Sequence, residues 1–389
     1  MDAGATPRYD MTEAALNEYE HIPTDEGAEE LLINMGPQHP STHGVLPLVL
    51  TLDGERVQKC VPHIGYLHSS MEKIAERKTY KQYVPYADRF DYLNAMGNEL
   101  CYVTAVEELL GIEVPPRGQF IRVIMAEMQR IASHLIYMAA IGIDTGATTV
   151  FLYGLREREL LLNLFELASG QRLLYHYLRI GGARNDLPGG FVEGLAKFLD
   201  LFPSRMKEYD AILTGNRIFR SRLEGVGAIS LEDARSYACT GPVLRACGVP
   251  YDVRKVAPYS VYDQFEFDVP TQDKGDCMSR HLVRMAEMRQ SVRILRQALE
   301  KLPEGEVNAK VPRIIKPPPG EAYARVESPR GELACWLISD GGDKPYRMHW
   351  RAPSFYNLQA IEHIARGIWV ADMVPVIATL DIILGDIDR

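Results

Sequence analysis

The chain lacks clustered cysteines. Its 389 residues include six cysteines, at positions 60, 101, 239, 247, 277 and 335, and no two of them stand in a C-x-x-C pair. Iron–sulfur clusters and structural zinc sites are held by closely spaced thiolates, so we expect this chain to carry neither by itself and to form no metal site. Scattered free thiols of this kind are typical of a reducing compartment.

Long apolar runs and targeting segments are also absent. A membrane-spanning helix needs about 18 or more consecutive apolar residues. The best candidate run, residues 121–143, is interrupted by Arg122, Glu127 and Arg130. Residues 1–30 are acidic and have neither the apolar core of a secretory signal nor the Arg-rich character of a transit peptide. We expect a chain that does not span a membrane, in which residues 1–30 form an arm suited to contacting a partner.

The signatures of nucleotide and nucleic-acid binding are missing. The formal net charge is −9, which gives no support for a basic stripe that would bind a phosphate backbone. The chain has no G-x-x-x-x-G-K-S/T phosphate loop and no G-x-G-x-x-G after a strand, and Gly225-Val226-Gly227 lacks the third glycine. We therefore expect no nucleic-acid partner, and no nicotinamide or flavin bound by this chain alone.

The composition that is present is ordinary for a globular protein, 46% apolar and 24% charged. Two strand-like runs, VLPLVLTL and ERVQKCV, flank Asp53-Gly54, a turn that favours positive φ, and this predicts a β-hairpin. A short helix is expected from a capping box at Ser69 and Glu72 to about Tyr83, ending before Pro85. Helical periodicity predicts longer helices over residues 88–110, 117–142, 154–170, 191–213 and 276–301.

These patterns predict an α+β fold that is mainly α. From residue 310 the chain carries Pro-rich linkers and short strand-like runs, which we expect to return to the hairpin and add strands to one small sheet. Residues 31–389 then form one domain after the arm. That domain comprises a β-hairpin lobe (31–62), a helical bundle (63–302) and an extended C-terminal part (303–389).

Two histidines stand four residues apart in NMGPQHPSTHG, residues 34–44. On a helix, His39 and His43 would share a face and could share a metal. Pro37 and Pro40 argue against a helix because each fixes φ, lacks an N–H and restricts the residue before it. The segment is therefore predicted to be a constrained loop at the mouth of the hairpin. The residues alone leave open whether these histidines bond nearby backbone or act on a ligand.

A dense polar cluster opens the second helix in PYADRFDYLNAM, residues 85–96. Asp88 suits a helix cap, and Arg89 suits a salt bridge with Asp88 or with another residue of its helix. Tyr92 lies one turn into the helix, and a buried tyrosine hydroxyl needs a partner, either a neighbouring residue or a ligand. In GIDTG, Asp144 stands between two glycines and is either a turn residue or a buried acid.

Eight motifs carry a family resemblance. In chain order they are MGPQHPSTHGVL, HIGYLH, MEKIAERKTY, PYADRFDYLNAM, RIASHL, SPRGEL, YRMHWRAPSFYNLQ and LGDIDR. Together they resemble the D subunit, also known as the 49-kDa-type subunit, of respiratory NADH–quinone oxidoreductase (complex I), and the resemblance runs from about Leu31 to Arg389. That family in turn resembles the large subunit of nickel–iron hydrogenases, which implies a hydrogenase-like helical bundle.

The second resemblance also bears on metal chemistry. Hydrogenases hold nickel and iron with two C-x-x-C pairs, whose positions correspond here to Asp91 with Asn94 and to Ile383 with Asp386. None of these four residues is a thiolate, so we expect no soft metal site there. Arg330 in ESPRGEL resembles an arginine retained from the hydrogenases. The resemblance implies that the former metal cavity is reused for an organic substrate.

The resemblance to complex I implies a core subunit of the peripheral arm that forms the quinone-reduction site with a neighbouring, cluster-bearing subunit. Such a subunit takes electrons from the terminal 4Fe–4S cluster of that neighbour and couples quinone reduction to proton translocation. The expected partners are the cluster-bearing B subunit, the C and I subunits, the H and A membrane subunits, and the quinone itself. The expected location is peripheral, on the cytoplasmic side of a bacterial cell membrane.

The resemblance also assigns roles to single residues. It implies that the hydroxyl of Tyr92 bonds one quinone carbonyl, that the imidazole of His43 contacts the headgroup, and that Asp144 pairs with that imidazole. Arg89 resembles the family's cluster-proximal arginine, where a fixed cation stabilises added negative charge. Further quinone contacts are implied at His39, Gly44, Val45 and Met96. Taken by itself, His39 fits a structural role in the loop.

Two departures from the family pattern lead to a further prediction. Ser69-Ser70 stands where relatives usually have Arg-Gly, which removes a cation near the cluster or the interface. Leu174 stands where many relatives have a histidine bonded to the cluster, and His176 lies two residues later. Loss of that hydrogen bond lowers the reduction potential of the cluster and weakens its pH dependence. We therefore predict a low-potential terminal cluster, matched to menaquinone.

Three other functions stay open at this point. The equivalent subunit of a ferredoxin- or deazaflavin-dependent quinone or phenazine oxidoreductase would share these motifs, because the electron-input modules are separate chains. A membrane-bound hydrogenase conflicts with the missing thiolates. A catalytically inert scaffold would keep the fold, and its activity would not depend on Tyr92.

Overall fold

The computed structural model describes residues 30–36 and 45–389, and within them the chain is mainly helical. The longer helices are α3 (Tyr80–Phe90), α4 (Ala95–Leu110), α5 (Pro116–Asp144), α6 (Thr148–Ser169), α7 (Phe191–Tyr209) and α12 (Cys277–Glu300). The shorter helices are α2 (Met71–Ala75), α8 (Arg217–Leu223), α9 (Leu231–Ser236), α10 (Pro242–Arg245), α11 (Val253–Val256), α13 (Pro353–Gln359), α14 (Ile361–Ile364), α15 (Met373–Leu380) and α16 (Leu384–Asp388). A π-helical turn, η2 (Asp210–Thr214), continues α7, and two 3-10 turns are η3 (Tyr262–Gln264) and η4 (Val370–Asp372).

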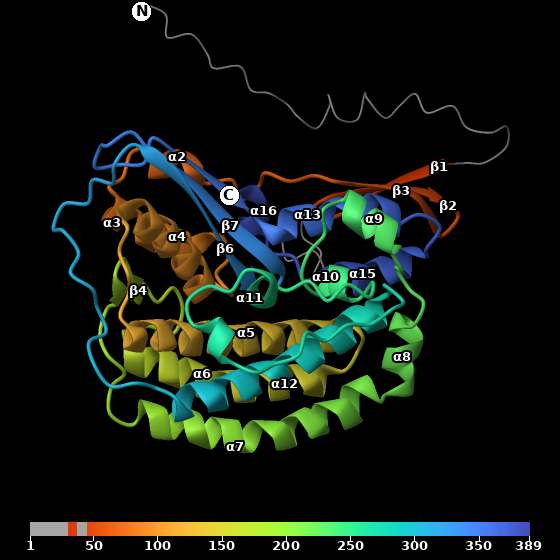
Figure 1. The fold of residues 1–389 in the computed structure, drawn as a ribbon. Coiled ribbons are helices and arrows are strands. Elements are labelled where there is room, and N and C mark those ends of the chain that lie inside the picture. The colour runs from red at the N-terminus through yellow and green to blue at the C-terminus, as the bar shows by residue number, and fades with distance from the viewer. Residues whose placement is uncertain (1–29, 37–44) are drawn as a thin grey trace, which may run out of the picture.

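The strands form small antiparallel sheets. They are β1 (Glu30–Met35), β2 (Leu48–Asp53), β3 (Arg56–Pro62), β4 (Leu178–Arg179), β5 (Gly182–Ala183), β6 (Gly320–Ser328), β7 (Gly331–Ser339) and β8 (Arg347–Arg351). In the part of the chain that the structure describes, the sheet orders are β1-β2-β3, β4-β5 and β6-β7-β8. Figure 1 shows the first and third of these sheets on one side of the molecule and helices α5, α6, α7 and α12 on the other.

Helix α5 is the central member of the helical layer. Pro116 stands in its first turn, where a missing N–H costs no intrahelical bond. Most of its residues are buried, because α5 packs against α6, α12, α4 and α15. Gly154 of α6 permits the closest approach, since a Cβ there would lie 3.0 Å from the carbonyl oxygen of Leu135. In Figure 1, α5, α6, α7 and α12 run roughly alongside one another below the sheets.

The prediction of one shared sheet is wrong. Strands β6, β7 and β8 make a sheet of their own, paired from Gly320 with Ser339 to Ser328 with Gly331 along the β6–β7 hairpin. This sheet packs on α4, which gives its apolar residues a core that does not involve the N-terminal strands. The C-terminal part does touch the N-terminal sheet, but through an isolated bridge between Arg56 and Trp369.

The predicted helices of the bundle are confirmed, with corrections before residue 95. The predicted capping box is wrong, because Ser70 precedes α2 in a left-handed conformation without a side-chain cap bond. The capping box lies instead at Thr79 and Gln82, at the start of α3. Pro85 does not stop that helix but lies inside it. The helix expected over 88–110 is interrupted after Phe90, and α4 begins at Ala95.

Length and hydropathy together decide whether a helix can cross a membrane. Among the helices of residues 30–36 and 45–389, none has the combination of the two that is needed to traverse a bilayer. The apolar residues of the long helices are buried because these helices pack against one another and against the sheets.

Candidate functional site

The break between α3 and α4 shapes the candidate site. Asp91 leaves the helical conformation with φ −116° and ψ 89°, and its side chain is buried. The amide of Asn98, one turn into α4, donates to the carbonyl oxygens of Asp91 at 3.0 Å and of Ala87 at 3.1 Å. The backbone N–H of Leu93 donates to Asp91 Oδ1 at 3.2 Å. These bonds fix a turn that presents Asp91 and Tyr92 together.

Arg330 connects this turn to the C-terminal segment. It comes from the tight turn between β6 and β7 and is 1% exposed. Its Nη1 lies 3.1 Å from Asp91 Oδ2, and its Nε donates to the carbonyl oxygen of Asp381 at 2.9 Å. Its Nη2 lies 3.6 Å from Asp381 Oδ1. One guanidinium therefore joins residues from opposite ends of the chain.

Asp386 of α16 is the third carboxyl group at this site. The backbone N–H of Ser354, at the start of α13, donates to Asp386 Oδ2 at 2.9 Å. Asp386 Oδ1 is buried and has no hydrogen-bond partner among the described residues. The charge of Asp386 acts on Asp91, so the structure brings together two of the four positions that the resemblance is expected to match with hydrogenase cysteines. Asn94 and Ile383, the other two such positions, are buried as well.

Burial dominates the ionisation of these groups. It raises the pKa of Asp91 to about 7, with the negative charges of Asp386 and Asp381 adding to the effect and Arg330 opposing it. Burial also raises the pKa of Asp386, which hydrogen bonds from Ser354 oppose. Tyr92 is half-buried, and burial raises the pKa of its hydroxyl against the pull of Arg330. At neutral pH the phenol is therefore protonated and able to donate.

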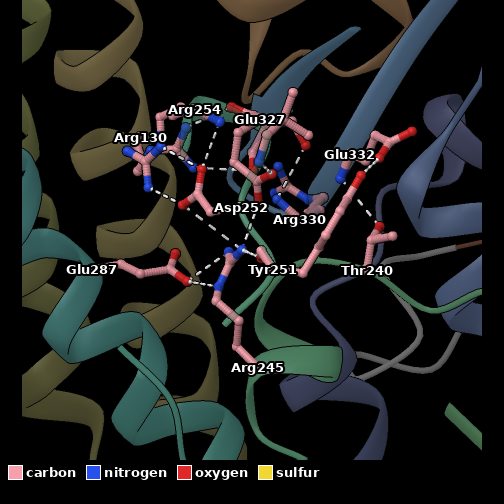
Figure 2. Close-up of polar contacts among 12 residues, drawn as sticks. Arg130, Thr240, Arg245, Tyr251, Asp252, Arg254, Glu287, Glu327, Arg330 and Glu332 are labelled. Carbon is pink, nitrogen blue, oxygen red and sulfur yellow. Dashed lines mark hydrogen bonds and ion pairs between the residues drawn. The ribbon is translucent and has the colours of Figure 1, made fainter. Parts of the chain in front are cut away.

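A buried ion network holds the Arg330 turn in place. Figure 2 shows Arg245 between Glu287 and Glu327, with Nε 2.8 Å from Glu287 Oε1 and Nη1 2.8 Å from Glu327 Oε1. Arg130 of α5 donates to the carbonyl oxygens of Glu327 and Ser328, the last residues of β6. The network thus ties the hairpin that carries Arg330 to α5, α10 and α12.

A second carboxyl pair lies beside α3. Asp88 is not a helix cap, because it is buried and its Oδ2 accepts from the backbone N–H of His176 at 2.9 Å. Glu99 of α4 accepts from the N–H of Leu178 at 2.6 Å, and the charge of Asp88 acts on Glu99. Burial raises the pKa of Asp88 to about 6 and that of Glu99 well above its usual range. The pair therefore shares a proton at neutral pH.

Arg89 lies on the exposed side of α3, next to this pair. Its Nη1 donates to the carbonyl oxygen of Pro85, one turn earlier in the helix. Its charge lowers the pKa of Asp88 and also acts on His176. Burial, together with Arg179, Arg184 and Arg89, lowers the pKa of His176 to about 4. A positively charged surface thus surrounds a neutral imidazole.

The other predicted site residues are spread over the chain. His39, His43 and Gly44 lie outside the described residues. Asp144 is the last residue of α5 and is half-buried. The charges that act on the Tyr92 hydroxyl come from Arg330, Asp91 and Asp381. Two predicted apolar contacts, Val45 and Met96, pack in the core. The pairing of His43 with Asp144 stays a prediction.

A polar hollow of about 350 Å³ lies elsewhere, near the chain's last residues. Its lining is His68, Ser70, Glu72, Lys73, Arg347, His349, Asp388 and Arg389. Asp388 fixes one wall, because its carboxylate accepts from the backbone N–H groups of Gly65 at 2.8 Å and Leu67 at 2.6 Å. Charged walls suit a polar ligand or a protein contact better than a quinone ring.

Sequence reasoning missed several residues of the site. Glu99, Asp381 and Arg284, whose Nε lies 3.6 Å from Asp381 Oδ2, each looked like an ordinary charged residue of a helix or its end. The available signal was charge inside strongly apolar stretches, because Lys, Arg, Asp and Glu are almost never fully buried unless paired. Asp381, within ATLDIILGDID, stands in such a stretch.

Side chains that could bind a metal are dispersed through the fold. In the part of the chain that the structure describes, no three His, Cys, Asp or Glu side chains are grouped so that they could hold a metal ion. The six cysteines are buried free thiols at separate places in the fold. In the Asp91–Arg330–Asp386 arrangement, the guanidinium of Arg330 supplies the positive charge that a metal ion would otherwise supply to balance the carboxylates.

Comparison with known proteins adds to this geometry. The family model described as "Respiratory-chain NADH dehydrogenase, 49 Kd subunit" matches residues 144–318 and 311–389. The D subunit of NADH-quinone oxidoreductase from Desulforamulus reducens is 51% identical over 360 residues, which are 92% of this chain and 98% of that protein. The D 2 subunit of the same enzyme from Symbiobacterium thermophilum is 51% identical over 381 residues, 94% of this chain and 99% of that protein. The D subunit from Geobacillus kaustophilus is 49% identical over 361 residues, 92% of this chain and 98% of that protein.

Proposed function

Because the chain belongs to the family of the 49-kDa subunit of respiratory-chain NADH dehydrogenase, the D subunit of NADH-quinone oxidoreductase, we propose that it contributes the quinone-reduction site of complex I. It is a subunit of that enzyme and has the other complex I subunits as partners. We propose that the site forms where this chain meets the cluster-bearing B subunit. We further propose that quinone reduction there is coupled to proton translocation.

The observation that carries this proposal is that the charge of buried Arg330 acts on the Tyr92 hydroxyl, at the turn where Arg330 is ion-paired with Asp91. Reducing a quinone places negative charge on its two oxygens, and it consumes two electrons and two protons. A phenol beside a buried guanidinium supplies a proton donor, and the fixed positive charge stabilises the negative charge that develops. The absence of thiolates at the four hydrogenase positions supports an organic substrate rather than nickel and iron.

The loop before β2 completes the proposed site. We propose that His43 contacts the quinone headgroup and pairs with Asp144, so that its charge can change around neutral pH. Val45 lies at the inner end of that loop and Met96 directly behind the Tyr92 turn, and both would present apolar surface to the quinone ring. His39 and Gly44 belong to the same loop and complete the set of proposed quinone contacts.

Electrons come from outside this chain. The terminal 4Fe–4S cluster of the neighbouring subunit supplies them one at a time when the complex is assembled. Arg89, Arg179 and Arg184, with a neutral His176 among them, offer a positive surface next to Tyr92's helix turn that suits an anionic cluster. We propose this surface as the contact with the cluster-bearing B subunit.

The segment after β3 supports further subunit contacts. Ile64, Tyr66 and Leu67 are 43%, 62% and 41% exposed, and the Asp388 carboxylate holds the backbone between them. Closely spaced, exposed large apolar side chains on a fixed loop are typical of a protein interface. We propose that the C and I subunits and the H and A membrane subunits complete the surroundings, on the cytoplasmic side of the membrane. We also propose a hydrogenase-like arrangement for the single domain of residues 31–389.

Replacing Tyr92 with Phe tests the proposed function. In the assembled complex, Tyr92→Phe should lower NADH–quinone reductase activity by about 10²-fold or more, because the proton donor is lost. NADH oxidation with an artificial electron acceptor should be unchanged. The matched control is Tyr86→Phe, a half-buried tyrosine of α3 that stacks on Tyr83. Near-normal quinone reductase activity in Tyr92→Phe would favour the inert-scaffold alternative.

The electron donor needs a separate experiment, because it binds another chain. Purification of the complex through this subunit should bring down a flavin-containing NADH module. Recovery of a ferredoxin- or deazaflavin-linked module in its place would favour the alternative oxidoreductase.

A further inference from the structure

We propose that Asp386 and Asp91 form, around Arg330, a buried proton store that returns a proton to Tyr92 after quinone reduction. The inference rests on the proposed function, because it concerns the proton that Tyr92 gives up. It assigns a role to the C-terminal residues of α16, which the quinone contacts leave unexplained.

The first support is a charge imbalance. Asp91, Asp381 and Asp386 are three buried carboxyl groups, and the two guanidinium groups among them belong to Arg330 and Arg284. Arg284 Nε lies 3.6 Å from Asp381 Oδ2, so both cations are already engaged. An unbalanced charge in a buried site is costly and is normally removed by binding a proton. Because three carboxyl groups share two cations, one of the three carboxyl groups is expected to be protonated.

The surrounding elements supply a further buried cation, Arg280 of α12, whose guanidinium donates to the Thr379 hydroxyl and to the carbonyl oxygens of Gly227 and Gly275 rather than to a carboxylate. From α5, His134 lies within the influence of Asp381, but burial lowers the pKa of its imidazole, so it stays neutral. Tyr137 of α5 is also neutral and contacts Arg284 through its ring. From α13, Ser354 offers a backbone N–H and a hydroxyl to Asp386. Arg389 acts on Asp386, but its guanidinium donates to the carbonyl oxygen of Trp350 at 2.7 Å.

The geometry indicates which carboxyl group holds the proton. Both oxygens of Asp91 accept, Oδ1 from the N–H of Leu93 and Oδ2 from Arg330, as an ionised carboxylate does. Asp386 has one bonded oxygen and one, Oδ1, without a partner among the described residues. A proton on Asp386 Oδ1 removes the charge of the poorly bonded group and leaves Asp91 as the partner of Arg330. Burial raises the pKa of both groups, which agrees with one proton being held by the pair, and the hydrogen-bond geometry favours Asp386 as its holder.

The proposed step balances in protons and electrons. The quinone takes its two electrons from the neighbouring cluster and one proton from the O–H bond of Tyr92, which leaves a phenolate beside Arg330. The O–H bond of Asp386 then breaks, its proton goes to the phenolate oxygen, and Asp386 becomes a carboxylate. The phenolate is the stronger base, so the transfer is favourable. The next proton from solvent refills Asp386, and the second quinone proton comes from elsewhere in the site.

The pH dependence of turnover tests the store. In the assembled wild-type complex, kcat for quinone reduction should fall as the pH rises through neutrality, because the store empties above its pKa. In Asp386→Asn, two carboxyl groups balance the two cations and no stored proton remains. Its kcat should therefore be about tenfold below that of the wild type at pH 6, and it should not fall further as the pH rises. Asp386→Glu should restore the fall. The control is Asp372→Asn, an aspartate of η4 that lies outside the cluster and faces Arg222, which should keep the wild-type shape.

A second variant changes the store without removing it. The hydroxyl of Ser354 bonds Asp386 and favours its ionised form. Ser354→Ala should therefore raise the pKa of Asp386 and move the fall in kcat upward by about one pH unit. Redox-difference infrared spectroscopy of the assembled complex should also show a protonated carboxyl band that is lost on quinone reduction, and this band should be missing in Asp386→Asn.

The outcomes separate this inference from the proposed function. A wild-type pH profile in both Asp386→Asn and Ser354→Ala, with the infrared band unchanged, would overturn the store while leaving the quinone site intact. Full activity in Tyr92→Phe would overturn the proposed function instead. If Asp386→Asn does not assemble, the direction of the shift in Ser354→Ala decides.

Discussion

At the scale of single residues, the molecule contains two pairs of buried carboxyl groups with different surroundings. Asp91 and Asp386 share Arg330, whereas Asp88 and Glu99 share backbone N–H donors from residues 176–178. The first pair has a buried cation, Arg330, between its members. The second pair has no such cation among the described residues, and the positive charges of Arg179 and Arg89 act on Asp88 without an ion pair. The second pair therefore costs folding stability when it loses its proton.

Replacing Glu99 tests that cost. Burial raises the pKa values of Asp88 and Glu99 in the folded protein, so the folded state holds their protons more tightly than the unfolded state does. The free energy of unfolding should therefore fall as the pH rises from about 4 through the folded pKa, which is about 6 for Asp88. Glu99→Gln keeps an acceptor for Leu178 and donates an amide to Asp88. It should raise the free energy of unfolding by about 1–3 kcal/mol at pH 8 relative to wild type. Thermal unfolding between pH 4 and pH 8 measures this.

The matched control is Glu108→Gln, in the same helix but exposed. It should leave the pH dependence of unfolding as in wild type. A Glu99→Gln variant that loses stability equally at every pH would show that Glu99 acts as a carboxylate acceptor alone.

Prediction from sequence succeeded for residues whose neighbours in the chain already looked unusual. Asp88, Arg89, Asp91 and Tyr92 fall within five residues, and that density marked the turn that the structure places at the site. Glu99, Asp381 and Arg284 could not be chosen in this way, because each gains its meaning from a partner far along the chain. The fold is needed to show which distant partner each of these charges meets.

At the scale of elements, the start of α3 and the start of α2 differ in how they are capped. Thr79 accepts from the N–H of Gln82, and the Gln82 side chain accepts from the N–H of Thr79. Ser70 precedes α2 with φ 54° and makes no cap bond. A serine in the left-handed region is strained, whereas a glycine is not.

Two substitutions should therefore act in opposite directions. Thr79→Ala should lower the free energy of unfolding by about 1 kcal/mol, because the capping box is lost. Ser70→Gly should raise it by up to about 1 kcal/mol, because the left-handed conformation loses its strain. Denaturant unfolding of both variants measures the two changes. Equal losses in both would show that Ser70 does cap α2.

Element prediction worked where one signal acted alone. Gly111 and Gly170 end α4 and α6 in the left-handed conformation, as their places after apolar runs suggested. Pro85 was misjudged, because tertiary packing of α3 outweighs one missing N–H. The sheet of β6, β7 and β8 was assigned to the wrong partner, because the sequence shows strand character and not which core a strand packs on.

At the scale of the whole molecule, the turn of residues 171–177 meets the positive surface around Arg89. Leu174 in this turn has φ 59°, a region where histidine is tolerated better than leucine. The backbone should therefore accept Leu174→His without rearrangement.

In the assembled complex, Leu174→His should raise the reduction potential of the terminal cluster. A histidine that binds a proton on reduction should also make the potential fall with pH, by up to about 59 mV per pH unit. A redox titration followed by electron paramagnetic resonance at several pH values measures both. A potential in the wild-type complex that is already high and strongly pH-dependent would contradict the prediction that the missing histidine matters.

The carboxyl groups on α16 and before it have a consequence for how the protein is made. Asp381 and Asp386 are synthesised after every other member of the Arg330 cluster, so a growing chain carries Arg330 and Asp91 in an incomplete interior until those residues leave the ribosome. The cluster is therefore completed after translation of the helices around it is finished. Ribosome-bound chains stalled before residue 381 should be cleaved readily by protease within β6–β7, and released chains should resist.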